Sequence, residues 1–141
     1  MAEISKNSSG LSGEYFVAAE LYRRGWSVGI TIGNAKAIDM LAEKDGTVTQ
    51  IQVKTIYRTK SVGWPIDKQQ IKRGIFYIFV NLMADKMESP EYFICTSEEV
   101  IKHHRQYKTR GIVNRSSIKK DKCLGAWDKL GQPLTPNAIK C

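Results

Sequence analysis

The sequence predicts an α/β fold in which a mixed β-sheet is flanked by α-helices. An amphipathic helical segment comes first, three segments rich in β-branched residues follow, and a long apolar segment lies at Gly74–Leu82. The 141 residues, of which 42% are apolar and 26% charged, suit one domain with an ordinary core. We therefore expect a single domain over 1–141, with a core over about 10–107 and a C-terminal helical extension over about 111–141.

The first helix is expected from Gly10 to Arg24. Ser9 or Ser12 can cap its start, because a serine hydroxyl accepts a hydrogen bond from the first free N–H groups of a helix. Gly25 follows a basic pair and is a stop signal. The sequence therefore predicts an N-terminal helix that ends at a glycine.

Glu14 shares a face of this helix with Val17, Ala18 and Leu21. A carboxylate on an apolar face is costly unless something pairs with it. Two interpretations remain open. Glu14 is either a functional carboxylate or an acid at the edge of the apolar stripe, in the first helical turn, where the helix dipole favours it.

Strand-like segments follow, separated by Gly-Asn and Asp-Gly turn signals. They are Trp26–Ile32, Ala37–Glu43 and Thr47–Ile56, and we expect them to form an antiparallel meander. The remaining predicted elements are a loop at Ser61–Pro65, a short helix at Ile66–Arg73, a strand buried on both faces at Gly74–Leu82, a short strand at Tyr92–Cys95, a helix from Ser97 to about Tyr107, and a last helix within Ser117–Leu130.

The dipeptide Asp45-Gly46 is a preferred two-residue hairpin turn and therefore fixes a register. Counting outward from the turn puts Asp39 across from Gln52 and Ala37 across from Lys54. Opposed residues project from one face with their Cβ atoms about 4.5–5.5 Å apart, so Asp39, Gln52 and Lys54 converge. The opposite face is expected to enter the core and carries Ile38, Met40, Ile51 and Val53.

This cluster suits the hydrolysis of a phosphodiester. A carboxylate and an amide oxygen can hold a hard cation such as Mg²⁺, and an ammonium can orient the attacking water or neutralise phosphate charge. The alternative is a solvated polar face of an antiparallel hairpin, which is common. The spacing alone leaves both interpretations open.

Glu14 on the first helix, the segment at 37–41 with Asp39, and the segment at 51–55 with Gln52 and Lys54 together resemble the core of PD-(D/E)XK nucleases. The resemblance is to the variant in which glutamine replaces the second acid, as in Mrr-type restriction enzymes. It covers about Gly10–Leu82 and implies a restriction-endonuclease-like fold. It also implies metal-dependent hydrolysis of DNA.

The resemblance implies a role for each residue of the motif. Asp39 would bind Mg²⁺ or Mn²⁺, Gln52 would add an oxygen ligand, and the carbonyl of Val53 would add another. Lys54 would assist the nucleophilic water, and Glu14 would be an outer or second-metal ligand.

Two departures from the family pattern point to an alternative function. Ile38 stands where the family has proline, and Gln52 lacks the charge of the second acid. Loss of that charge weakens cation binding. A catalytically inactive nuclease-like module that binds nucleic acid is therefore the alternative to the enzyme.

The net charge of +8 favours a polyanionic partner. Between Lys102 and Lys122 the chain has eight Lys or Arg residues and one acid. Such a run is either solvated surface or a phosphate-binding face. We expect nucleic acid, DNA rather than RNA, to be the partner. The candidate binding residues are Arg58, Lys60, Arg105, Lys108, Arg110, Arg115, Lys119 and Lys120.

Other functional classes find no support in the sequence. No apolar run approaches the roughly 20 residues that span a bilayer, so we expect no membrane partner and a cytoplasmic location. Cys95, Cys123 and Cys141 are far apart and odd in number, which favours reduced thiols over a zinc site or a disulfide framework. A homodimer is possible, because cutting both strands of a duplex takes two sites.

Two further side-chain types, histidine and tryptophan, are candidates for functional roles. The adjacent His103 and His104 point about 100° apart on a helix, so they cannot chelate one metal together. Trp127 is expected to anchor the last helix in the core. Trp64 is ambiguous, because it lies beside Pro65 in a basic loop and can be placed either in the core or at the mouth of the site.

Overall fold

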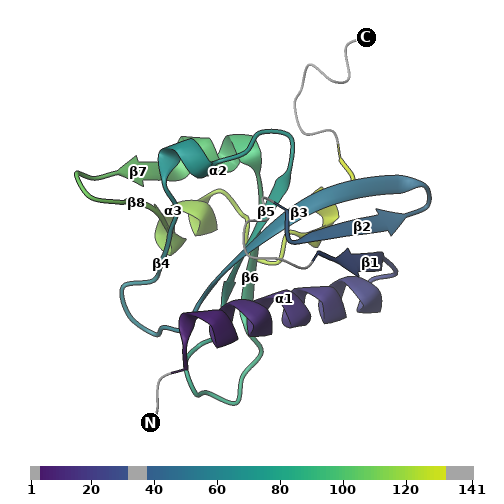
Figure 1. The fold of residues 1–141 in the computed structure, drawn as a ribbon, viewed down its shortest axis with the longest axis horizontal. Helices are drawn as coiled ribbons and strands as arrows, with labels where there is room; N and C mark the ends of the chain where they lie inside the picture. The colour runs from purple at the N-terminus through teal and green to yellow at the C-terminus, as the bar shows by residue number, and fades with distance from the viewer. Residues whose placement is uncertain (1–3, 32–37, 133–141) are drawn as a thin grey trace.

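A computed structural model describes residues 4–31 and 38–132 of the chain. Its main sheet has the strand order β1-β2-β3-β5-β6 (Figure 1). The strands are β1 at Ser27–Ile30, β2 at Met40–Lys44, β3 at Thr47–Ile56, β5 at Phe76–Asn81 and β6 at Glu91–Thr96. The first three are antiparallel, β3 and β5 are parallel, and β6 is antiparallel to β5. The predicted mixed sheet and meander are therefore confirmed.

Helix α1, Lys6–Arg23, covers one face of this sheet. It begins earlier than predicted, because the hydroxyl of Ser5, rather than that of Ser9 or Ser12, accepts a hydrogen bond from the N–H of Ser8 (3.1 Å). Glu14 is consequently well inside the helix and only 9% exposed. The interpretation of Glu14 as an acid of the first helical turn is wrong.

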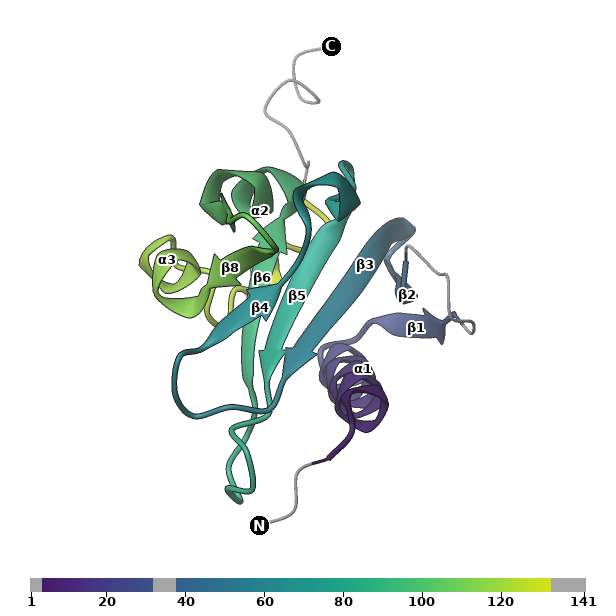
Figure 2. The same cartoon turned by 60° about the vertical axis from the view of Figure 1, so that its left-hand side comes forward.

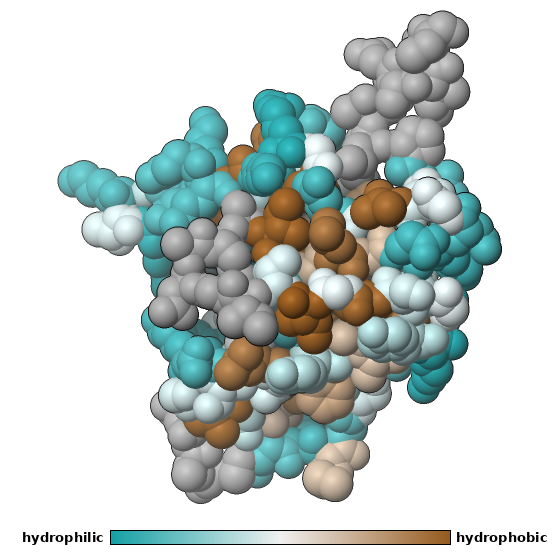
Figure 3. Space-filling view, turned by 45° about the vertical axis from the view of Figure 1, so that its right-hand side comes forward, coloured by the Kyte–Doolittle hydropathy of each residue, from teal (hydrophilic) through white to brown (hydrophobic). Residues whose placement is uncertain are grey.

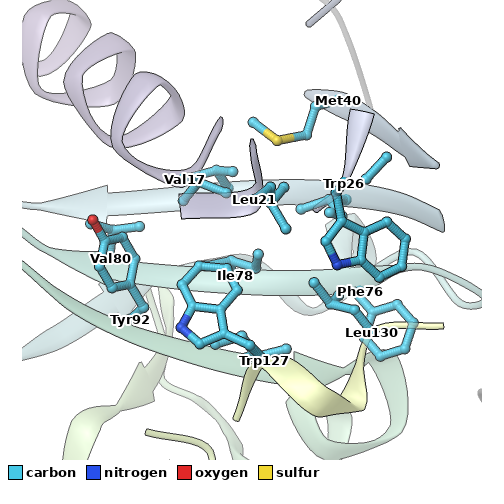
Figure 4. Close-up of a cluster of buried hydrophobic side chains, with 14 of the residues drawn as sticks. Val17, Leu21, Trp26, Met40, Phe76, Ile78, Val80, Tyr92, Trp127 and Leu130 are labelled. Atoms are coloured by element: carbon cyan, nitrogen blue, oxygen red, sulfur yellow. The ribbon is translucent and has the colours of Figure 1, made fainter. Parts of the chain in front are cut away.

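Close packing joins α1 to β3. A side chain at Gly13 would collide with Thr55, so the absence of a Cβ there lets the helix cross the strand at short range. Val17 and Leu21 of α1 point toward the sheet and pack with residues such as Ile78 (Figure 4). All six residues of β5 are buried, as predicted for an interior strand.

A small second sheet covers the opposite face of the main sheet, together with α2 and α3 (Figure 2). Its strand order is β4-β8-β7, with β4 at Gly63–Pro65, β8 at Gly111–Asn114 and β7 at His104–Gln106, and the two helices are α2 at Ser97–His103 and α3 at Arg115–Lys120. A second apolar core lies beneath this sheet. The molecule therefore has a helix on one side of its main sheet and a layer of short strands and helices on the other.

Trp64 belongs to this second core. Its side chain is fully buried, and its Nε1 donates a hydrogen bond to the carbonyl of Val80 (2.9 Å). Its ring lies 5.2 Å from that of Phe79, measured between centroids. The idea that Trp64 lies at the mouth of the site is therefore wrong.

Several short elements differ from the sequence prediction. The expected loop at 61–65 contains β4, and the expected helix at Ile66–Arg73 is reduced to a 3-10 turn at Lys68–Gln70. Helix α2 ends at His103, because the following residues pair with β8 as strand β7. The start of the expected helical extension is β8 itself. The three short strands β4, β7 and β8 arise from pairing within the second sheet.

The predicted last helix is found only in part, as α3, which covers positions 117–120 of the expected range. Residues 123–125 run along the edge of β6 instead, where Ile94 N–H donates to the carbonyl of Cys123 (3.0 Å) and Gly125 N–H to that of Tyr92 (2.8 Å). A 3-10 turn, Trp127–Lys129, follows. Trp127 is nevertheless buried, with its ring 5.2 Å from that of Tyr92 (Figure 4), so its role as a core anchor is confirmed.

Within residues 4–31 and 38–132, no helix has the length and apolar character needed to cross a bilayer. Cys95 and Cys123 are buried free thiols, whereas Cys141 lies outside the described residues.

Candidate active site

The site predicted from the sequence lies where β3 changes neighbours. Strand β2 pairs with positions 47–51 of β3, and β5 pairs with positions 51–56. Among the described residues, Ile51 is the position of β3 that pairs on both sides. Beyond it, no described residue continues the β2 ladder along that side of β3.

The hairpin register agrees with the prediction over the length of β2. Lys44 pairs with Thr47 and Leu41 with Gln50. The turn residues Asp45 and Gly46 have φ angles of 51° and 82°, and the tight two-residue hairpin turn requires positive φ at both positions. The ladder stops with Met40 opposite Ile51, one residue short of the predicted pair of Asp39 and Gln52. Ala37, expected opposite Lys54, lies outside the described residues.

Asp39 bridges the two strands at the point where the ladder stops. Its backbone N–H donates to the carbonyl of Ile51 (2.9 Å), and its carboxylate Oδ2 accepts the N–H of Val53 (2.7 Å). The side chain is only 6% exposed. A buried backbone N–H needs a partner, and here a carboxylate replaces the missing strand. Asp39 is therefore held against Val53, between the chain neighbours Gln52 and Lys54.

Gln52 and Lys54 project from the same face of β3, because side chains alternate along a strand. Ile51 and Val53 face the other way and join the core beneath α1. Gln52 and Lys54 are both half-buried, opposite Tyr77 and Phe79 in the parallel register. The two polar side chains therefore lie on the face away from α1.

Glu14 approaches from α1, on the other face of the sheet. It follows Gly13, whose contact with Thr55 fixes this part of the helix over the C-terminal half of β3. Glu14 and Asp39 are both buried and each has further interactions. The structure thus brings Asp39 into contact with Val53, places Gln52 and Lys54 on one face of β3, and places Glu14 on α1 over the other face.

The available donors suit a hard cation better than zinc. In the part of the chain that the structure describes, no three His, Cys, Asp or Glu side chains form a group able to hold a metal. A cation at this site would need the Gln52 amide and a backbone carbonyl in addition to Asp39 and Glu14. All of these donors are oxygen atoms, which fit Mg²⁺ or Mn²⁺.

Three of the predicted nucleic-acid-binding residues, Arg58, Arg110 and Arg115, line one open groove of about 1200 Å³. Thr55, next to Lys54, lines it as well. The remaining predicted residues, Lys60, Arg105, Lys108, Lys119 and Lys120, are exposed outside it. The groove therefore connects part of the basic surface to the end of β3.

The charge of Arg115 is neutralised by an ion pair with Glu91. Its guanidinium makes two hydrogen bonds to the carboxylate of Glu91 (2.6 and 2.9 Å) and lies over the ring of Phe93. The guanidinium lowers the pKa of Glu91 below its ordinary value. Arg115 is thus a structural residue as well as a groove residue.

Sequence reasoning missed Lys6, which also lines the groove. Lys6 belongs to the first turn of α1. That turn was not predicted, because the start of the helix is rich in glycine and serine, which are not typical of a helix interior. A capping serine at Ser5 is the signal that would have revealed it. Both histidines are half-buried, and His103 contacts Asp121 while His104 contacts the carbonyl of Ile66 (each 2.7 Å).

The comparisons with known proteins agree with this geometry. Residues 4–73 match the family model described as PD-(D/E)XK endonuclease. No curated protein sequence matches the chain. The structure resembles the bacterial homing endonuclease I-Ssp6803I, with a TM-score of 0.62, 15% identity and coverage of 92% of this chain and 95% of that one.

It also resembles Hjc of Archaeoglobus fulgidus, a Holliday junction resolvase, with a TM-score of 0.53, 13% identity and coverage of 79% and 88%. These likenesses show that the fold is restriction-endonuclease-like, as predicted. The likeness to the homing endonuclease extends well beyond residues 10–82, to which the sequence resemblance was confined. The segments after Leu82 are therefore largely part of the shared architecture.

Proposed function

The chain carries a PD-(D/E)XK nuclease-like core, and on that premise we propose that it is a metal-dependent endonuclease that hydrolyses phosphodiester bonds in DNA. One observation carries the proposal. The buried Asp39 carboxylate is held 2.7 Å from the N–H of Val53, at the point where β3 leaves β2 and between Gln52 and Lys54. A fixed carboxylate beside an amide and an ammonium is a suitable arrangement for phosphodiester hydrolysis.

Each residue has a proposed task. Asp39, Gln52 and the carbonyl of Val53 would hold Mg²⁺ or Mn²⁺, with Glu14 as an outer or second-metal ligand. When bound, such an ion polarises the phosphate and lowers the pKa of water. Lys54 orients the attacking water and offsets negative charge that develops on the phosphate. Gln52 contributes no charge, so Asp39 supplies most of the attraction for the cation.

The alternative is a module that binds nucleic acid without cutting it. The neutral Gln52 favours this alternative, because a hard cation binds less tightly when an acid is replaced by an amide. Both functions require nucleic acid as the partner. Metal-dependent cleavage is the property that separates them.

A homodimer is part of the proposal, because cutting both strands takes two sites. Figure 3 shows apolar side chains gathered in the middle of one face, with hydrophilic ones around them. The exposed apolar residues of the meander are Ile30, Leu41 and Val48. An apolar area of this kind favours self-association, which sedimentation equilibrium would measure. A cytoplasmic location remains a prediction.

Incubation of the purified protein with supercoiled plasmid, linear duplex, single-stranded and branched DNA, and RNA tests the enzyme. We expect nicking or cleavage of DNA with Mg²⁺ or Mn²⁺ and none with EDTA. Lys54→Ala should abolish it, whereas Gln50→Ala, on the same strand and face, should cleave normally. If the wild type and Gln52→Glu both bind one of these substrates but cleave none, the binding module replaces the enzyme.

A further inference from the structure

The groove beside the site has a mixed lining that the proposed chemistry does not explain. It lies between the end of β3, the second sheet and the start of α1. Thr55, Tyr57 and Arg58 reach it from β3 and the loop that follows, and Lys6 reaches it from the first turn of α1. Thr55 follows Lys54 along the chain, so the groove reaches the strand that carries the candidate active site.

The cations of the groove are available to a ligand. Lys6, Arg58 and Arg110 form no ion pair with any described residue, and none of the residues that line the groove is acidic. Lys102 and Lys129, outside the groove, are each paired with a carboxylate. The groove therefore carries positive charge that no acidic residue of its lining offsets, and such a surface suits a chain of phosphates.

Aromatic and apolar side chains line the groove together with these cations. Tyr107 lies in the loop of the β7–β8 hairpin, where its N–H donates to the carbonyl of Arg110 (2.8 Å), and its side chain is 58% exposed. Tyr57 is half-buried against the core, and Ile112 contributes apolar surface. A duplex presents phosphates and sugars to such a groove lining, whereas an unpaired strand also presents the faces of its bases.

We propose that this groove binds a single-stranded segment of DNA and leads it to the site on β3. Arg58, Arg110 and Lys6 contact the phosphates, and Tyr107 stacks on a base. The inference rests on the proposed nuclease function and narrows its substrate to DNA that contains an unpaired strand, such as a flap, a gap or an open branch. Proteins that bind single strands usually combine aromatic side chains, on which the bases stack, with a basic groove that follows the phosphate backbone.

Binding in EDTA tests the inference independently of cleavage. The probes are a fluorescein-labelled oligothymidylate and a labelled duplex of equal length, followed by anisotropy. Tyr107→Ala should weaken binding of the single strand by about fivefold or more while leaving duplex binding unchanged. Tyr107→Phe keeps the ring and should bind like the wild type. Tyr15→Ala is the matched control, because Tyr15 is similarly exposed (65%) on α1 outside the groove.

The salt dependence of binding gives a second measurement. Arg58→Ala and Arg110→Ala should each reduce the slope of log K against log salt for the single strand by about 0.7. Lys86→Ala, an exposed cation outside the groove, should leave the slope unchanged. Equal losses for single strand and duplex with Tyr107→Ala, or no loss for either, would overturn the inference.

The two proposals fail in different ways. If every DNA form is cleaved with Mg²⁺ and Tyr107→Ala has no selective effect on the single strand, the groove assignment fails and the nuclease stands. If the single strand binds as described but nothing is cleaved, the groove assignment stands and the nuclease fails.

Discussion

The two halves of β3 have the same alternation of apolar and polar residues but different surroundings. Positions 47–51 form a regular hairpin with β2, whereas positions 51–56 pair with β5, and among residues 4–31 and 38–132 only Ile51 of that stretch has a ladder partner on the other side. In the hairpin half, the backbone hydrogen bonds of β3 on this side are made with β2. The other half uses the carboxylate of Asp39 for the N–H of Val53. The site therefore arises where a strand loses a neighbour, and Asp39 has both a structural and a chemical role there.

The largest effect is expected from Asp39→Ala. It would remove the main anionic ligand of the proposed metal site, and it also leaves the buried N–H of Val53 without its acceptor. Cleavage should be lost, and the free energy of unfolding should fall by about 1–3 kcal/mol. Urea denaturation measures the second effect. Asp39→Asn, which keeps an oxygen acceptor, should lose cleavage but most of the stability should remain. Equal destabilisation by both variants would contradict the structural role.

Lys54→Ala should affect activity alone. Removal of a group that stabilises charge in the transition state typically costs a factor of about 100 or more in rate. The thermal midpoint should stay close to that of the wild type. Lys54 is half-buried, and its side chain does not take the place of a backbone hydrogen-bond partner as the carboxylate of Asp39 does. Gln50→Ala, in the hairpin half, is the control and should change neither property. A comparable loss of cleavage with Gln50→Ala would mean that the two halves do not differ.

Gly13→Ala tests the packing of α1 on the half of β3 that carries the site. The added methyl group would collide with Thr55 and should destabilise the protein by about 1–3 kcal/mol. Gly10→Ala is a matched control in the same helix, because nothing lies within 4 Å of a Cβ there. It should stabilise the helix by up to about 1 kcal/mol. Destabilisation by both substitutions would indicate that the close approach at Gly13 is not the cause.

The smallest effect concerns the ion pair of Arg115 with Glu91, on the opposite side of the main sheet from α1. Hydrogen bonds from Arg115 lower the pKa of Glu91. The pair therefore stabilises the fold above the unfolded pKa of Glu91, and this stabilisation is lost as the pH falls through the lower, folded value. Glu91→Gln should cost about 1 kcal/mol at neutral pH.

Below the folded pKa of Glu91, the Glu91→Gln variant and the wild type should be equally stable. Glu98→Gln, which removes the exposed pair with Arg73, should cost less at neutral pH. A pH-independent effect of Glu91→Gln would show that the charge of Glu91 is not responsible.

Local signals made the site region predictable. Asp45-Gly46 fixes the hairpin register by backbone conformation alone, and the continuous apolar character of β5 indicates burial. Both signals act over a few residues. The placement of Asp39, Gln52 and Lys54 on neighbouring strands follows directly from them.

The second sheet was not predictable in the same way. Its strands β4 and β7 have three residues each, which is too short for a periodic pattern, and Gly63 pairs with Asn114 far along the chain. Residues 123–125 likewise follow β6 rather than their own helical spacing. Because the groove is built by this sheet and by the unexpected first turn of α1, the sequence predicted some of its cations but not the groove.

The most direct test of the account is Mn²⁺ binding to the wild type and to three variants of the site, measured by electron paramagnetic resonance of the free ion in the presence of a short DNA strand. The wild type should bind Mn²⁺, and Lys54→Ala should bind it with similar affinity because the lysine is not a ligand. Asp39→Ala should bind it much more weakly, and Gln52→Glu more tightly, since a carboxylate replaces an amide. Wild-type affinity in Asp39→Ala would contradict the claim that the switch point of β3 is a metal-dependent active site.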